Sequence, residues 1–305
     1  MKIGSHVSNK GSEMLAGSVM EAGSYGSNCF MTYLGAPQNT FRKPLEDLKI
    51  GEMHELLKEH NIDIKDVVVH APYIVNLAQP NDEKRRFAVE FLTKELKTCD
   101  AIGATLMVLH PGAHVGEGPE AGIKRIAAGI NEMFENTKGS KVMILLETMA
   151  GKGTECGRSF EEIKAMMDLI EDKSRIGVCL DTCHIHDGGY DIVNDYENVI
   201  NEFDRIIGLE HLKVLHLNDS KNLRGTHKDR HENFGFGQIG FETLMKFAND
   251  ERFRDLPKIL ESPYVPKDKN TSYPPYKFEI EMIRANQFNP NLKEEIVEYF
   301  ESNKN

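Results

Sequence analysis

Eight short apolar runs, each followed by a segment with helical periodicity, constrain the fold of this 305-residue chain more than any other feature. The runs are Lys2–Val7, Cys29–Leu34, Val67–His70, Thr105–His110, Val142–Glu147, Ile176–Asp181, Lys213–Leu217 and Lys258–Glu261. They are nearly continuous in apolar residues, which is typical of parallel strands buried on both faces. Their ends lie roughly 30–45 residues apart, the length of a strand, a crossover helix and two loops.

The segments between these runs carry the apolar spacing of helices. Pro44–His60 and Asn81–Ile102 repeat leucine, valine, methionine and phenylalanine at helical intervals among charged residues. Ser159 with Glu162 three residues later has the pattern of a capping box. Eight β/α units favour an α/β fold of the TIM (β/α)8 barrel type. The alternative is a doubly wound sheet, which usually has fewer strands and a glycine-rich first turn that is absent here.

No segment has the composition of a domain linker. We therefore expect residues 1–305 to form one TIM-barrel domain. The segment 262–305 is expected to hold a long proline-rich loop over Ser262–Tyr276 and a closing helix at Lys293–Phe300.

Composition excludes several classes of protein. The 37 basic and 48 acidic residues give a formal charge of −11, which argues against a protein that coats DNA through bulk positive charge. The five cysteines are odd in number and form no CxxC pair, so reduced thiols are expected. The sequence shows neither a signal-peptide pattern nor a run of about 20 apolar residues, so we expect a cytoplasmic protein with no membrane partner.

Ionisable residues stand at or next to the C-terminal ends of six runs. They are His70, His110, Glu147, Asp181, His216 and Glu261. In a TIM barrel these ends converge on one mouth, where active sites lie. Imidazoles and carboxylates that meet at one place form the ligand set for zinc or a similar divalent metal.

Two local motifs enlarge this set. Asp181-Thr182-Cys183-His184 adds a second imidazole after a strand-end carboxylate, and Asp229-Arg230-His231 places a carboxylate and an imidazole two residues apart. The nine candidates exceed the ligands of one four-coordinate metal, so two or three metals are indicated. Thiolate ligation by Cys183 stays open beside the commoner reading of a packed thiol.

Other residues near the mouth allow more than one interpretation. For His6, a place behind the ligands and a purely structural role both remain open. His114 and His186 lie in mouth loops, where structural roles are commoner than substrate contact. The segment Gly151–Thr154 lacks the spacing of a phosphate-binding loop.

Basic and amide side chains surround the expected mouth and suit a phosphate polyanion. The loop after the seventh run is strongly basic and carries Lys221, Arg224, Lys228 and Arg230. The loop after the second run carries Gln38, Asn39, Arg42 and Lys43. Tyr73, three residues beyond His70, is an aromatic side chain that could wedge into a base stack.

These residues resemble the endonuclease IV family, the metal-dependent apurinic/apyrimidinic endonucleases, over residues 1–265. The matching stretches are Gly4–Ser8, His110–His114, Leu146–Thr148, Gly177–His184, His216–Ser220, Asp229–His231 and Leu260–Glu261. The resemblance implies a TIM barrel with three zinc ions, although manganese or iron could replace zinc at some sites.

Carried over residue by residue, the resemblance implies three ligand groups. His70 and His110 would hold one zinc, which Glu147 would bridge to a second. Asp181, His216 and Glu261 would complete the second site, and His184, Asp229 and His231 would hold the third. Tyr73 matches the family's duplex-inserting tyrosine, and Arg42 is the candidate for its inserting arginine.

The resemblance further implies hydrolysis of the phosphodiester 5′ to an abasic site in duplex DNA, leaving a 3′-hydroxyl and a 5′-deoxyribose phosphate. Trimming of blocked 3′ ends would use the same metal-activated hydroxide, with Glu147 bridging metals and Glu261 orienting the nucleophile. We expect a monomer. The alternatives are a metal-dependent sugar isomerase or epimerase on a similar barrel, and a DNA-binding protein without catalysis.

The net charge takes a different meaning under this assignment. Three divalent cations would outweigh the four carboxylates among the ligands, so the mouth would be locally positive. The acidic total would then describe the outer surface of the barrel.

Overall fold

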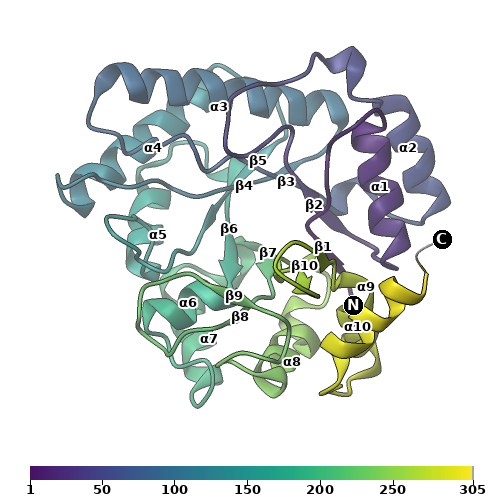
Figure 1. The fold of residues 1–305 in the computed structure, drawn as a ribbon. Coiled ribbons are helices and arrows are strands. Elements are labelled where there is room, and N and C mark those ends of the chain that lie inside the picture. The colour runs from purple at the N-terminus through teal and green to yellow at the C-terminus, as the bar shows by residue number, and fades with distance from the viewer. Residues whose placement is uncertain (304–305) are drawn as a thin grey trace.

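A computed structural model describes residues 1–303 of the chain (Figure 1). Within that range the principal sheet has eight parallel strands in the order β1-β10-β7-β6-β5-β4-β3-β2. The strands are β1 (Ile3–Ser5), β2 (Phe30–Thr32), β3 (Val67–His70), β4 (Leu106–Leu109), β5 (Met143–Glu147), β6 (Ile176–Asp181), β7 (Leu212–His216) and β10 (Lys258–Leu260). Each strand lies within or overlaps one predicted apolar run.

The sheet closes between its first two strands. The amide of Val7 donates to the carbonyl oxygen of Met31 at 2.8 Å, and His6 forms a parallel bridge with Met31. The fold is therefore the predicted TIM barrel, and the doubly wound alternative is wrong.

Helices surround the strands as an outer ring (Figure 1). They are α1 (Met14–Ser24), α2 (Ile50–Glu59), α3 (Asp82–Ile102), α4 (Pro119–Glu135), α5 (Phe160–Leu169), α7 (Tyr196–Ile206) and α8 (Phe241–Asn249). The predicted cap of α5 is present, because the hydroxyl oxygen of Ser159 accepts from the amide of Glu162 at 3.3 Å. The Glu162 carboxylate accepts in turn from the amides of Gly157 and Arg158.

The apolar core has two layers, one on each side of the barrel strands. The larger layer lies between strands and helices. The inner layer consists of Cys29, Met31, Val68, Val108, Leu145, Cys179, Val214 and Ile259. Because side chains alternate across a strand, the residue two positions after an inner residue also faces the barrel axis, but at the mouth. The fold thus directs the six strand-end candidates toward one point.

In β1 the inner position is occupied by Gly4, which has no side chain. A Cβ on Gly4 would lie 1.8 Å from the backbone oxygen of Cys29, so no larger residue fits between β1 and β2 at this level. His6 then occupies the mouth position of β1.

The C-terminal segment differs from the prediction. The expected loop over Ser262–Tyr276 contains a hairpin of β11 (Val265–Pro266) and β12 (Ser272–Tyr273). A helix that was not predicted, α9 (Tyr276–Ala285), buries Ile280 and Ile283. The closing helix is confirmed as α10 (Leu292–Ser302).

Two expectations from composition can be compared with the structure. No helix within residues 1–303 is both long and apolar enough to cross a membrane. All five cysteines are buried and unpaired. Burial raises the pKa of the Cys29 and Cys179 thiols to about 12, so both stay protonated at neutral pH.

Candidate metal centre

Nine side chains at the mouth form three adjoining groups of metal-ligand type. Within each group the ligand atoms lie within 4.8 Å of one another. The groups are His70 with His110 and Glu147; Glu147 with Asp181, His216 and Glu261; and His184 with Asp229 and His231. The structure therefore brings together all nine residues that the sequence singled out, in the groups that the resemblance implied.

Glu147, at the end of β5, lies between the first two groups. Its Oε2 is 3.1 Å from Nε2 of His70 and 3.0 Å from Nε2 of His110. Its Oε1 is 2.9 Å from Nδ1 of His216. Burial alone would raise the pKa of Glu147, but the imidazoles of His216 and His110 hold it well below its usual value. One ionised carboxylate thus faces both groups and is placed to bridge two cations.

Asn218 ties the second group together and was not predicted as a site residue. Its Nδ2 donates to Oδ2 of Asp181 at 2.8 Å and to Oε2 of Glu261 at 3.0 Å. Its Oδ1 accepts from the backbone amide of Glu261 at 2.8 Å. The sequence signal was its position two residues after His216, which puts both side chains on one side of an extended chain.

The third group joins α6 (Thr182–Gly188) to the hairpin of β8 (Asp219–Ser220) and β9 (His231–Glu232). Asp181 caps α6, since its Oδ1 accepts from the amide of His184 at 2.9 Å. Oδ1 of Asp229 lies 3.1 Å from Nε2 of His184 and 3.4 Å from Nε2 of His231. The Asp229 carboxylate therefore joins α6 to the hairpin that ends in β9.

Backbone carbonyl groups orient three of the imidazoles. Nδ1 of His70 donates to the oxygen of Ala71 at 2.6 Å, and Nδ1 of His184 donates to that of Thr148 at 2.8 Å. Nδ1 of His231 donates to the backbone oxygen of Glu261 at 3.2 Å. In the neutral rings this leaves Nε2 free as a ligand, the usual arrangement behind a metal-bound histidine.

The residues present fit divalent cations. Nε2 of His231 is buried and makes no hydrogen bond, although it faces carboxylate oxygens. Burial alone would lower the pKa of His184, yet Asp181 and neighbouring carboxylates raise it well above its usual value. The carboxylates therefore favour a positive charge among the imidazoles. A divalent cation bound between them supplies that charge.

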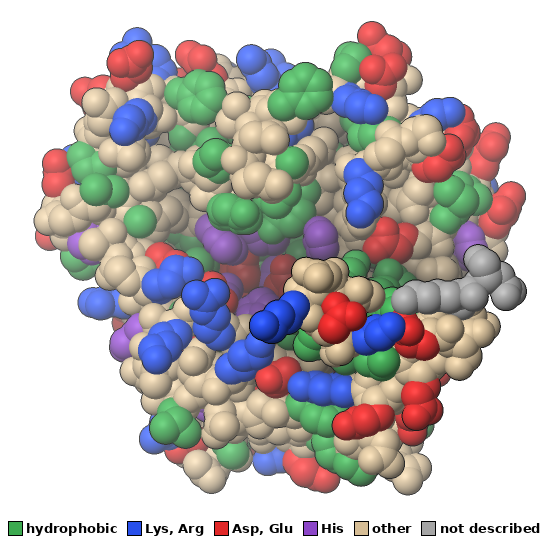
Figure 2. Space-filling view, viewed as in Figure 1, with side chains coloured by type: hydrophobic (Ala, Val, Ile, Leu, Met, Phe, Trp, Pro, Cys, Tyr) green, Lys and Arg blue, Asp and Glu red, His purple; other side chains and the backbone are tan. Residues whose placement is uncertain are grey.

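Four of the five basic residues predicted to contact DNA lie on one side of the mouth. Figure 2 shows histidine side chains on the floor of a central hollow, with lysine and arginine gathered beside it. Residues 221–230, here called the basic loop, connect β8 to β9, and Lys221, Arg224, Lys228 and Arg230 are carried on it. Arg224 pairs with Asp191. The basic loop thus borders the third ligand group.

Tyr73 lies on the loop after β3 with 55% of its surface exposed. The adjacent Ile74 is 50% exposed. It was not predicted as a site residue, although the sequence shows it directly after Tyr73, the candidate for insertion into a base stack. A cavity of about 240 Å³ lies between Tyr73 and His110. An aromatic tip, an apolar neighbour and a small cavity therefore adjoin the first ligand group.

The loop after β2 differs from expectation at one residue. Gln38 and Asn39 lie on it, and Asn39 is exposed, as a DNA contact requires. Arg42 instead points inward: its Nε is 2.8 Å from Oε1 of the buried Glu95, and its guanidinium lies 4.9 Å from the ring centre of Phe91. In this placement Arg42 is paired with Glu95 and anchors its loop, and its role as an inserting arginine stays a prediction.

The residues left open by the sequence take structural positions. The ring of His6 packs 5.3 Å from that of Tyr33, which packs 5.0 Å from His70, so His6 lies behind a ligand. His114 accepts from the amide of Gly118 through Nδ1 at 3.1 Å. His186 donates to the carbonyl oxygen of Asn222 at 3.1 Å. Burial raises the pKa of the Cys183 thiol, whose sulfur also lies within 4.8 Å of ligand atoms of Asp181 and His231, so thiolate ligation stays open.

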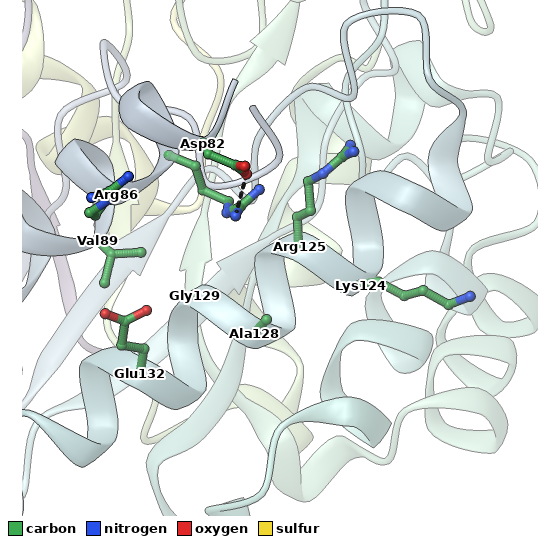
Figure 3. A pocket seen from close by; sticks show the side chains of 9 residues that line it. Asp82, Arg86, Val89, Lys124, Arg125, Ala128, Gly129 and Glu132 are labelled. Atoms are coloured by element: carbon green, nitrogen blue, oxygen red, sulfur yellow. Dashed lines mark ion pairs between the residues drawn. The ribbon is translucent and has the colours of Figure 1, made fainter. Parts of the chain in front are cut away.

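A separate groove of about 550 Å³ lies between α3 and α4 on the outer ring (Figure 3). Its cations are largely paired with carboxylates: Arg85 with Asp82 and Lys124 with Glu120, each at 2.7 Å, and Arg125 with Glu117. This groove therefore lacks the open ligand set of the mouth.

Comparison with known proteins agrees with this geometry. A family profile described as "Xylose isomerase-like TIM barrel" matches residues 19–286. A protein of Acholeplasma laidlawii named "Probable endonuclease 4" is 54% identical over 291 residues, which cover 95% of this chain and 97% of the relative.

Solved structures give the same picture. The crystal structure of endonuclease IV from Thermus thermophilus superimposes with a TM-score of 0.81 at 30% identity, covering 94% of this chain and 98% of that one. A D-tagatose 3-epimerase-like protein superimposes with a TM-score of 0.68 at 17% identity, covering 94% and 97% of the two chains, which shows a shared fold alone.

Proposed function

This chain belongs to the endonuclease IV family, and from that premise we propose that it is a DNA-repair endonuclease acting at abasic sites. It hydrolyses the phosphodiester 5′ to the missing base in duplex DNA and leaves a 3′-hydroxyl and a 5′-deoxyribose phosphate. The third ligand group carries this proposal, because His184, Asp229 and His231 add a site that borders the basic loop.

The three groups are suited to three zinc ions, the metal that imidazole and carboxylate ligands together favour. His70 and His110 would hold the first with Glu147; Asp181, His216 and Glu261 would hold the second with Glu147. His184, Asp229 and His231 would hold the third. When bound, divalent ions would supply charge for the phosphate oxygens and lower the pKa of water.

Glu261 is the carboxylate best placed to handle the proton of the attacking water. Its side chain is 19% exposed, whereas that of Glu147 is 1% exposed. Burial would raise the pKa of Glu261, but His216 and His231 hold it low, so it stays ionised as a proton acceptor. Asn218 fixes its direction, because Nδ2 of Asn218 donates to Oε2 of Glu261 and Oδ1 of Asn218 accepts from the backbone amide of Glu261.

The surface around the cluster selects the damaged nucleotide. Tyr73 and Ile74 present exposed apolar surface for insertion where stacking is broken. A missing base lowers the cost of turning the nucleotide out of the duplex toward the cavity beside His110. Gln38, Asn39 and the exposed cations of the basic loop hold the flanking phosphates.

The same cluster supports trimming of blocked 3′ ends. A phosphate ester at a 3′ terminus presents the same oxygens and the same leaving 3′-oxygen as the internal bond. The ligand groups and Glu261 therefore need no rearrangement for this second reaction.

A sugar isomerase or epimerase on this barrel is the rival function. Such enzymes commonly use one or two metals, and a sugar needs no cationic border. The third ligand group and the basic loop speak for a phosphate polyanion and against this rival.

The deciding experiment incubates the purified protein with a duplex that contains one stable abasic-site analogue. We expect one incision, 5′ to the analogue, with a 3′ end that a polymerase extends. Chelation should abolish the incision, added zinc should restore it, and the undamaged duplex should stay intact. Three zinc ions per chain would support the nuclease, while one or two exchangeable magnesium or manganese ions with an intact duplex would favour the isomerase.

A further inference from the structure

Asp187 is a buried carboxylate beside the third ligand group, but it belongs to none of the groups. It lies on α6, three residues after His184, so the two side chains project from neighbouring positions of one helical turn. Its exposure is 0%. A buried carboxylate that faces no cation needs several hydrogen bonds. The residues that donate those bonds show which part of the chain Asp187 fixes in place.

Three donors reach this carboxylate, all from the basic loop or its base. The hydroxyl of Ser220 donates to Oδ1 at 2.6 Å. Nδ2 of Asn222 donates to Oδ2 at 2.9 Å, and the backbone amide of Asp229 donates to the same oxygen at 2.8 Å. The backbone oxygen of Asp187 also accepts from the amide of His227 at 3.0 Å. One residue therefore holds both ends of the basic loop.

The loop needs such an anchor. Asp229 and His227 have φ values of 55° and 54°, a left-handed conformation that is unfavourable for residues with a Cβ. Between the paired ends, most of the basic loop is exposed to solvent. Two other contacts hold the stretches beside Asp229, from Nδ1 of His227 to the oxygen of Ala150 at 2.7 Å and from the amide of Lys221 to the oxygen of Arg230 at 2.9 Å, but the amide of Asp229 itself donates to Asp187.

The backbone amide and the side-chain carboxylate of Asp229 both contact the same turn of α6. Its backbone amide binds Asp187, and its carboxylate faces Nε2 of His184 at 3.1 Å. A shift of the Asp229 backbone would withdraw its carboxylate from both His184 and His231. Asp187 thus holds the backbone of the residue whose carboxylate joins the third group.

We propose that Asp187 is a positioning residue that assembles the third metal site and fixes the basic loop against it. It binds no metal and touches no substrate; it acts through Asp229. This inference rests on the proposed three-metal function.

The test measures metal retention as well as cleavage. Wild type, Asp187→Ala, Asp187→Asn and Ser220→Ala are loaded with zinc and dialysed, and bound zinc and its release to a chromophoric chelator are measured. We expect Asp187→Ala to lose about one zinc per chain, or to release it at least about tenfold faster, as for other residues that orient metal ligands. Its KM for the abasic duplex should also rise more than its kcat falls.

The other variants separate positioning from general stability. Asp187→Asn should retain the zinc, because its amide oxygen can still accept from the Asp229 amide. Ser220→Ala and Asn222→Ala leave that bond intact and should also retain it. Asp66→Ala is the matched control: Asp66 is a buried carboxylate paired with Lys2 at 2.8 Å, before the start of β3 and away from the mouth.

Several outcomes would overturn the proposal. Wild-type zinc retention in Asp187→Ala would do so, as would equal zinc loss in Asp66→Ala or in Asp187→Asn. If Asp187→Ala does not fold, zinc loss in Ser220→Ala or Asn222→Ala decides against it. Failure of the proposed function looks different: wild type itself would then hold fewer than three zinc ions or leave the abasic duplex intact.

Discussion

Glu261 and Glu147 carry the same carboxylate but have different access to substrate. Glu147 is enclosed by imidazoles, while Glu261 keeps part of its surface at the mouth. Glu261→Gln preserves the shape and the contacts with Asn218 but removes the proton acceptor. We expect kcat for abasic-site cleavage to fall at least about a hundredfold, as for loss of a general base.

The measurement is single-turnover cleavage combined with equilibrium binding of the abasic duplex. The Kd should stay within about threefold of wild type, since no phosphate contact is lost. Zinc content is measured alongside, so that metal loss is separated from loss of the base. Cleavage at the wild-type rate would contradict the role given to Glu261.

Glu279, on α9, links the C-terminal segment to two ligand-bearing stretches of chain. Its Oε1 accepts from the amide of Phe234 at 3.0 Å and from Nδ2 of Asn233 at 3.2 Å. Asn233 also donates to the backbone oxygen of Pro263, two residues after Glu261. Burial raises the pKa of Glu279 to about 7. A pH-dependent stability follows from that shift.

Because the folded pKa of Glu279 exceeds the unfolded one, the folded state keeps a proton that the unfolded chain releases. The resulting penalty is absent below the unfolded pKa, grows as pH rises, and is complete above about pH 7. Glu279→Gln should therefore raise the free energy of unfolding at pH 8 by about 1–3 kcal/mol, with little gain at about pH 4.5. Urea unfolding at both pH values checks this; Glu281→Gln, at an exposed position of the same helix, should show no such difference.

At the scale of elements, the basic loop is expected to govern affinity more than chemistry. Lys221 and Lys228 are exposed on it and stand outside the ligand groups. Replacing both by serine should raise the Kd for abasic duplex about tenfold at low salt and leave kcat within about twofold. The slope of log K against log salt should become shallower by about 1–2, because each lost phosphate contact contributes roughly 0.9.

Binding titrations at four salt concentrations measure this slope. Lys138→Ser is the matched control, since Lys138 is exposed just after the end of α4, remote from the mouth. An unchanged slope in the double variant would show that the basic loop does not contact phosphate.

The elements also show how far sequence reasoning reaches. The strands were predictable because parallel barrel strands are continuously apolar, and the ligand positions followed because each strand ends at a fixed register. Helix α9 was missed because Pro274 and Pro275 precede it, and prolines there mark a loop as readily as a helix start. The ion pair of Arg42 could not be predicted, because nothing in its local sequence indicates Glu95, 53 residues away, as its partner.

Asn218 and Asp187 show a second limit of the same kind. Each acts by hydrogen bonds to residues that are remote in sequence, so neither motif nor spacing assigns its role. Such partners are fixed by the tertiary structure alone, and the ligands themselves are predictable mainly because metals require particular side chains.

At the scale of the whole molecule, we propose that residues 1–305 unfold as one cooperative unit. The outer apolar layer is continuous from Ile3 in β1 to Ile296 in α10. Calorimetry should therefore show a single transition. Removing metal by chelation should lower Tm by at least about 5 °C, because ligands that bind only the folded state stabilise it.

Adding zinc back should restore the original Tm, whereas magnesium at the same concentration should not. Two separate transitions in the metal-loaded protein would contradict the single unit. A Tm that is insensitive to chelation would contradict metal binding at the mouth.

The inner apolar layer determines from which end of the barrel substrate binds and product leaves. Cys29, Met31, Val68 and their neighbours close the barrel beneath the ligand groups. These apolar side chains fill the barrel, so substrate and product reach the ligand groups from the mouth and not from the opposite end of the barrel. Cleaved DNA must therefore leave from the same mouth at which intact DNA binds. Product and incoming substrate compete for that one surface.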